Sequence, residues 1–195
     1  MYISFWKVVH FVFAIIHMKK ILLAVIVAMT AVAANAQFWV GGSFGLNFIK
    51  PDYSNSEVLT NFTLAPEVGY KINDKWDVAV ALNESFIAVD GEFYNTFTFE
   101  PYARYTFAKT GIASFFVDGG IGVGASGFEG DDFFGDSRFN FYLGFRPGVN
   151  IALSQKVGMV AKLGFIGYEF VDDAYHTFGI NLNNSPLTFG MYYNF

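Results

Sequence analysis

The amino-acid sequence predicts an all-β fold, an eight-stranded antiparallel transmembrane β-barrel of the up-and-down type. Three observations lead to this fold class. Apolar and polar residues alternate with a period of two in eight segments, which is typical of strands with one apolar and one polar face. The connections between these segments alternate between long and short, and the charged residues within the segments share the polar face. Such patterns are typical of a barrel with a polar interior and an apolar outer wall.

The composition agrees with a wall that faces lipid. Of the 195 residues, 53% are hydrophobic, 20% are aromatic and only 15% are charged, which is more apolar than a soluble domain of this size requires. The formal net charge of -5 argues against a nucleic-acid-binding protein, which favours a basic face. Because the chain contains no cysteine, it can form neither a disulfide framework nor a thiolate metal site.

The first 36 residues are predicted to be an N-terminal extension followed by a secretory signal peptide. Lys19 and Lys20 precede an apolar run over residues 21–29, and small residues then lead to a cleavage position after Ala36. Residues 1–17 are too apolar for the charged start of a signal peptide, so we expect translation to begin at Met18. A membrane anchor is disfavoured because the 14 residues from 21 to 34 fall short of the roughly 20 needed to span a bilayer. The barrel is predicted over residues 37–195.

The predicted strands follow one another along the whole of this domain. In chain order they cover residues 38–48, 62–72, 76–82, 97–107, 115–123, 139–153, 157–165 and 187–195. The connections are long at 49–60, 87–95, 126–137 and 171–186, and short at 73–74, 108–111 and 154–155. An even number of strands puts both termini on the rim of the short turns, so we expect periplasmic termini and turns and extracellular long loops.

The polar face of the predicted strands carries a balanced set of charges. By parity it holds Glu67, Lys71, Asp77, Glu100, Arg104, Asp118, Arg146 and Lys162. The interior of an eight-stranded barrel is just wide enough to be filled by side chains, and an unpaired charge there is costly. These residues are therefore predicted to form an interior ion-pair network. Arg146 has four candidate partners among the acids, of which Glu100 is favoured because it holds the equivalent position in the hairpin repeat. A soluble lipocalin-like barrel, the main alternative, would place its charges outside.

The long loops are predicted to be acidic. They hold ten acids against two bases: Asp52, Glu57, Asp90, Glu92, Glu129, Asp131, Asp132, Asp136, Asp172 and Asp173 against Lys50 and Arg138.

Three prolines mark a weak repeat within the barrel. Pro66, Pro101 and Pro147 each stand seven residues before a short turn. Proline removes a donor from the strand ladder, so we expect a bulge or a locally broken ladder at each of them, at one common height.

Several stretches resemble the small outer-membrane β-barrel proteins of Gram-negative bacteria, the OmpA/OmpX-like group and the outer-membrane protein β-barrel domain family. They are "PEVGYKIND" (66–74), "FEPYARYTFAKTG" (99–111), "FRPGVNIAL" (145–153) and "TFGMYYNF" (188–195). The last is similar to the family's C-terminal insertion signal, which implies that Phe189, Met191, Tyr193 and Phe195 are read by the barrel-assembly machinery. The resemblance implies the bacterial outer membrane as location. It implies little about activity, since the family includes adhesion, structural and secretion-associated roles.

Three features invite a catalytic or ligand-binding interpretation, and each has a simpler one. Residues 122–127 match GxGxxG, but no helix follows to bind a pyrophosphate. Asp131, Asp132 and Asp136 lack the spacing of a calcium loop, although loose divalent binding stays an alternative. His176, with Asp172, Asp173 and Ser185 in the same region, could form a Ser-His-Asp arrangement, but the spacing does not favour it. We expect no metal site and no cofactor.

The sequence therefore predicts a porin-like cell-surface protein with a plugged interior, acting in a structural or surface-interaction role and without enzymatic activity. Its expected partners are outer-membrane lipid, the barrel-assembly machinery and an extracellular partner at the loops. The alternative is a narrow channel for small solutes or ions. A membrane-embedded lipid-modifying enzyme built on His176 is the third hypothesis.

Overall fold

The structure, a computed structural model, describes residues 37–49, 59–89, 92–128, 138–181 and 188–195. The chain divides into two compact units, residues 1–36 and residues 37–195, and the boundary coincides with the predicted cleavage position. The signal peptide and the start at Met18 lie outside the described residues and stay predictions.

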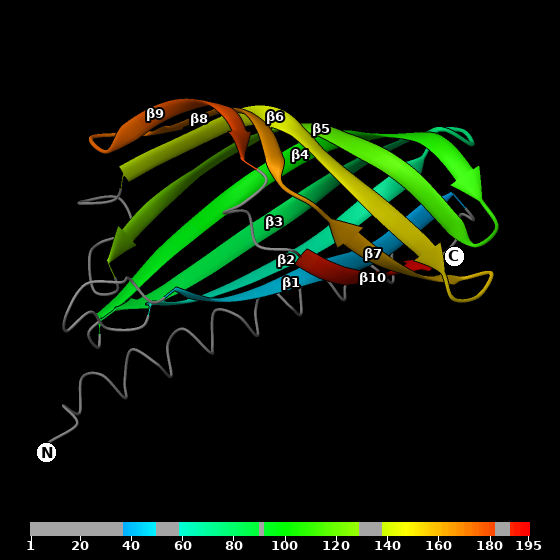
Figure 1. The fold of residues 1–195 in the computed structure, drawn as a ribbon, viewed down its shortest axis with the longest axis horizontal. Helices are drawn as coiled ribbons and strands as arrows, with labels where there is room; N and C mark the ends of the chain where they lie inside the picture. The colour runs from blue at the N-terminus through cyan, green and yellow to red at the C-terminus, as the bar shows by residue number, and fades with distance from the viewer. Residues whose placement is uncertain (1–36, 50–58, 90–91, 129–137, 182–187) are drawn as a thin grey trace, which may run out of the picture. The chain divides into compact units, whose positions relative to one another are not determined.

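The second unit is a closed antiparallel barrel, which confirms the predicted fold class (Figure 1). Its strands are β1 (Phe38–Ile49), β2 (Leu59–Lys71), β3 (Trp76–Val89), β4 (Glu92–Thr110), β5 (Ala113–Phe128), β6 (Arg138–Ala152), β7 (Val157–Lys162), β8 (Phe165–Val171), β9 (Tyr175–Asn181) and β10 (Thr188–Asn194). Neighbours in sequence pair from β1 to β6, and β10 pairs with both β1 and β7 to close the ring. Because β6 pairs with β7 and with β8, these two segments form one barrel strand. The segments β9 and β10 form the eighth, so ten segments build eight strands.

The short connections have local sequence causes. The side-chain oxygen of Asn73 accepts hydrogen bonds from the backbone N–H groups of Lys75 and Trp76, at 2.9 and 3.0 Å. The hydroxyl of Ser154 accepts equivalent bonds from residues 156 and 157. Gly111 supplies the positive φ, 55°, that the turn between β4 and β5 requires. We call the rim formed by these three turns the turn side, and the opposite rim the loop side.

Two of the predicted long loops are wrong. The connection expected over 171–186 is a turn of residues 172–174 followed by β9, and Asp173 adopts the positive φ of 51° that this turn needs. The connection expected over 87–95 shrinks to residues 90–91, because β3 runs to Val89 and β4 begins at Glu92. Backbone pairing holds both hairpins together whatever their side chains are, so their strands extend beyond the regular alternation.

The two faces of the wall have opposite character. Inward-facing Trp39, Glu67 and Arg104 are buried, whereas Phe145 and Met191 on the outside are 57% and 59% exposed. A continuous exposed apolar wall of this kind requires a non-aqueous surrounding. No helix within the described ranges is long and apolar enough to cross a membrane.

The strand ladder is broken at each of the three prolines, as predicted. Pairing with the following strand is interrupted at Pro66 and at Pro101, while pairing with the preceding strand continues. At Pro147 the interruption coincides with a bulge. Gly148 pairs with Lys162 and Phe145 with Ile166, so residues 146–147 of β6 lie opposite the three residues 163–165. Gly164 has the positive φ of 63° that suits such a bulge. The common height of the three breaks stays a prediction.

Candidate functional site

The charges inside the barrel form an ordered row. Lys71, Asp77, Arg104, Asp118 and Arg146 are successive cross-strand partners from β2 to β6. Directly opposite residues on one face of an antiparallel pair are near neighbours, and opposite charges there attract. Alternating sign along the row therefore places every charge of the row beside one of opposite sign.

Arg104 is the centre of the buried network. Its Nε and Nη2 donate to the two carboxylate oxygens of Asp118 at 2.6 and 2.8 Å, and Nη2 also donates to the hydroxyl of Tyr192 at 3.1 Å. The guanidinium carbon lies 3.8 Å from the ring centre of Phe116 and 5.5 Å from that of Trp39. Since bidentate pairing and ring contacts both suit a guanidinium, this cation is well compensated despite its burial.

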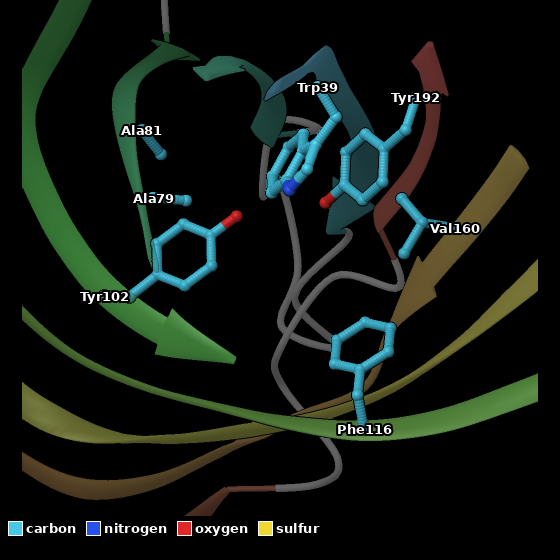
Figure 2. Packing of buried hydrophobic residues seen from close by; sticks show 7 residues of the cluster. All are labelled: Trp39, Ala79, Ala81, Tyr102, Phe116, Val160 and Tyr192. Carbon is cyan, nitrogen blue, oxygen red and sulfur yellow. The ribbon is translucent and has the colours of Figure 1, made fainter. Parts of the chain in front are cut away.

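Glu67 joins this pair to a second one. The carboxylate accepts from Lys162 Nζ at 2.8 Å, from the hydroxyl of Tyr192 at 2.9 Å and from that of Tyr102. Lys162 Nζ also lies 3.5 Å from Asp118, so that both pairs belong to one network. Figure 2 shows the hydroxyls of Tyr102 and Tyr192 turned into the interior from β4 and β10.

The third ion pair joins Arg146 to Glu100, the partner expected from the sequence. Glu100 also accepts a hydrogen bond from the side-chain amide of Asn83 at 2.6 Å. The Arg146 guanidinium lies against the rings of Tyr142 and Phe165, with its carbon 4.8 and 5.5 Å from the two ring centres.

Six of the eight charged residues of the proposed site are thus brought into ion pairs within the described residues: Glu67, Glu100, Arg104, Asp118, Arg146 and Lys162. Lys71 is exposed near the turn side and Asp77 is half-buried beside it, and neither takes part in these pairs.

The aromatic part of the interior was missed at the sequence level. Trp39, Tyr102, Phe116 and Tyr192 are buried together with Val160 (Figure 2). The centres of the four rings lie 3.8 to 5.7 Å from the guanidinium carbon of Arg104. The inward-facing glycines of the sequence could have indicated these buried aromatic side chains. A Cβ added at Gly69 would lie 2.1 Å from the ring of Trp39, so the glycine makes room for an aromatic side chain from the neighbouring strand.

Residues of the network line two cavities inside the barrel. The loop-side cavity has a volume of about 510 Å³ and includes Arg146 and Lys162 in its lining. The turn-side cavity, of about 120 Å³, is lined by residues that include Trp39, Arg104 and Phe116. Among the described residues, none lines both of these cavities.

The other sequence candidates do not assemble into sites. Residues 122–127 lie within β5, a strand. His176 is exposed on β9 and Asp172 and Asp173 are exposed in the preceding turn, whereas Ser185 lies outside the described residues. Asp131, Asp132 and Asp136 also lie outside them. In the parts of the chain that the structure describes, no three His, Asp or Glu residues are grouped so that they could hold a metal ion.

The residues of the predicted C-terminal signal lie on β10 and directly after it. Phe189, Met191 and Tyr193 are exposed on the outer wall, and the ring of Phe195 packs edge-on against that of Tyr193 with centres 5.2 Å apart.

The family described as outer membrane protein beta-barrel domain matches residues 21–195 of the chain. The chain belongs to this family. Its location is accordingly the bacterial outer membrane. The fold is similar to the crystal structure of Neisserial surface protein A (NspA), with a TM-score of 0.52 and 15% sequence identity over 83% of this chain and 98% of that one. The outer membrane protein Ail of Yersinia pestis, solved in a phospholipid bilayer nanodisc, matches with a TM-score of 0.48 and 17% identity over 83% of this chain and all of that one. No curated protein matches the sequence.

Proposed function

We propose that this protein is a plugged outer-membrane barrel with a structural or surface-interaction role, without a solute path and without enzymatic activity. The observation that carries the proposal is the ion-pair and aromatic network whose residues line the two interior cavities. In this proposal, the ion-pair network inside the barrel is the functional site of the protein, and its function is to close the interior.

The energetics of the network support a permanent plug. A path would require the pairs Arg104–Asp118 and Lys162–Glu67 to separate, and both pairs are buried. Separating a buried pair without new partners costs about 3–5 kcal/mol. The rings of Phe116 and Trp39 would also have to leave the Arg104 guanidinium. The closed state is therefore strongly favoured.

Conductance in a planar bilayer tests the plug. The full mature chain, reconstituted, is expected to give no steady conductance. The narrow channel is the competing hypothesis, and a steady current whose ion selectivity changes in Arg146→Gln or Glu100→Gln would replace the plug with that channel.

We propose that the turn side faces the periplasm and that the acidic loops face the exterior, where they bind a partner of the cell surface. Both described ends support this orientation, since the backbone N–H of Phe195 donates to the carbonyl of Phe38 next to the short turns. Because the chain has no cysteine, a single introduced cysteine can show which rim of the barrel is accessible from outside the cell. A membrane-impermeant maleimide should label Asp173→Cys but not Ser154→Cys on intact cells, and the reverse pattern would overturn the orientation.

We further propose that translation begins at Met18, that the signal peptide is cleaved after Ala36, and that the C-terminal residues Phe189, Met191, Tyr193 and Phe195 engage the barrel-assembly machinery. Mass spectrometry of the protein purified from outer membranes should give a chain that begins at Gln37. A mature protein that retains residues 21–36 would contradict this processing.

The absence of enzymatic activity has a direct test. The exposed position of His176 supports a non-catalytic role, because a triad histidine needs an orienting carboxylate and a nucleophile within hydrogen-bond distance. The purified protein is expected not to hydrolyse phospholipid. Hydrolysis that disappears in His176→Ala would establish the enzyme hypothesis instead.

A further inference from the structure

The loop-side cavity has the size and lining of a ligand site. Its volume of about 510 Å³ lies within the range of roughly 300–1,000 Å³ that small-molecule sites occupy. Serine and threonine hydroxyls from β1, β2, β3, β4, β9 and β10 line it, together with one amide: Ser43, Thr63, Ser85, Thr96, Thr98, Thr177, Thr188 and Asn83. Such a lining offers hydrogen bonds to the hydroxyls of a solute, and Tyr142, Phe165 and Ile180 add an apolar surface for its carbon skeleton.

The charge accessible from this cavity is positive. The side chain of Arg146 is 26% exposed, whereas its partner Glu100 is 7% exposed. Lys162 is 10% exposed, whereas Glu67 is fully buried. The cations therefore face the cavity while the acids lie behind them. Among the described residues of the lining Glu169 is the one acid, and it accepts a hydrogen bond from the hydroxyl of Tyr175 at 2.9 Å.

Arg146 is held ready to bind an anion. Its guanidinium packs against the rings of Tyr142 and Phe165, which restrict its plane, and both rings also line the cavity. Nη1 donates to Glu100 and the guanidinium also bonds to the side chain of Tyr142, and its five N–H donors form a rigid fork that matches a carboxylate. Lys162 is engaged by Glu67 and Asp118, whereas Arg146 has one carboxylate partner among the described residues, Glu100, so a ligand carboxylate would share the Arg146 guanidinium with Glu100.

We propose that the loop-side cavity binds a small, hydroxyl-rich monoanion with the chemistry of a sugar acid. The carboxylate of the ligand pairs with Arg146, and its hydroxyls bond to the Ser, Thr and Asn side chains of the wall. Because Glu100 already compensates part of the Arg146 charge, a single planar carboxylate suits this guanidinium better than a doubly charged phosphate does. The inference goes beyond the structural role proposed above, because it assigns a ligand to the space above the plug.

Titration calorimetry on the full mature chain, folded in detergent micelles, tests the proposal with D-glucuronate as the probe. Glucose, which lacks the carboxylate, is expected to bind at least about tenfold more weakly, because a charge-assisted hydrogen bond contributes about 1.5–3 kcal/mol. Glucosamine, a cation, is expected not to bind. Equal binding of glucose and glucuronate, preference for glucosamine, or no binding of glucuronate would each overturn the proposal.

Two variants locate the site, and one serves as the control. Arg146→Lys keeps the ion pair with Glu100 but loses the fork, so glucuronate should bind about tenfold more weakly. Gly179→Leu should abolish binding by filling space, since Gly179 lines the cavity and an added Cβ there meets no atom within 4 Å. Phe178→Leu, on the outer side of the same hairpin and 83% exposed, should leave binding unchanged. Unchanged binding in Gly179→Leu would place the ligand elsewhere and overturn the proposal.

The bilayer conductance of the wild type tests the plug separately from ligand binding, so the two proposals can fail independently.

Discussion

Replacing Glu67 by Gln should destabilise the barrel through a charge rather than through packing. The carboxylate accepts from Lys162 Nζ and from the hydroxyls of Tyr102 and Tyr192. Removing one partner of a buried ion pair costs about 3–5 kcal/mol. Gln keeps the volume and one acceptor oxygen, and Asp118 still lies 3.5 Å from Lys162. We therefore expect a loss of about 2–3 kcal/mol in the free energy of unfolding, near the lower end of that range.

A double-mutant cycle separates the charge effect from the rest. Lys162→Met alone leaves the Glu67 carboxylate buried with hydroxyl donors only, so it should cost about 3–5 kcal/mol. In the double variant neither charge remains, and its loss should be smaller than the sum of the two single losses by about 2 kcal/mol. Reversible urea unfolding in the presence of phospholipid vesicles, followed by tryptophan fluorescence, measures all four proteins. Asp74→Asn, in an exposed turn, is the control and should stay within about 0.5 kcal/mol of the wild type. Losses that add within about 0.5 kcal/mol would refute a coupled network.

Four further outcomes follow from the same structure. Phe145→Lys, in the middle of β6 on the outer wall, should cost about 2–4 kcal/mol in vesicles, whereas Phe107→Lys near the turn side should cost about 0–1 kcal/mol; equal losses would contradict a membrane-buried wall. Arg146→Ala should lower the unfolding temperature because Glu100 loses its cation, with a loss of about 2 kcal/mol given the partial exposure of Arg146; unchanged thermal stability would disprove the pairing. Gly69→Val should displace the Trp39 ring, cost about 1–3 kcal/mol and shift the tryptophan emission, and an unaltered spectrum would count against this packing. Phe195→Ala should reduce the amount of folded protein in outer membranes of intact cells while the stability of the refolded protein stays the same, and a normal yield in cells would argue against a C-terminal signal.

The faces of the strands were predictable because the side-chain period of a strand is two. Once Arg146 and Glu100 are placed on the inner face, charge balance in a narrow interior leaves few arrangements. The same reasoning could not rank partners for Lys162, since Glu67 and Asp118 both lie within reach and only the register and the rotamers decide. The two-residue alternation of the strands therefore predicts which residues belong to the network better than it predicts which of them form ion pairs.

Strand ends were less predictable than strand faces. Beyond Leu82 the alternation of β3 becomes irregular at Asn83 and Glu84, yet the backbone pairs with β4 as far as Val89. Side-chain patterns report burial, whereas the ladder is held by backbone groups that every residue except proline supplies. A barrel strand can thus extend past the membrane-depth region without any sequence signal.

A glycine of β5 makes room beside the third ion pair. Glu100 lies on β4 and Arg146 on β6, and β5 runs between them. Gly122 on β5 is the register partner of Tyr142, and a Cβ added to it would lie 2.1 Å from the Tyr142 ring. The missing side chain leaves room for groups of β6 to approach β4 over the inner surface of β5. The glycine pattern of residues 122–127, which at the sequence level raises the question of a nucleotide site, therefore belongs to the interior packing: Gly122 makes room for the Tyr142 ring, against which the Arg146 guanidinium lies.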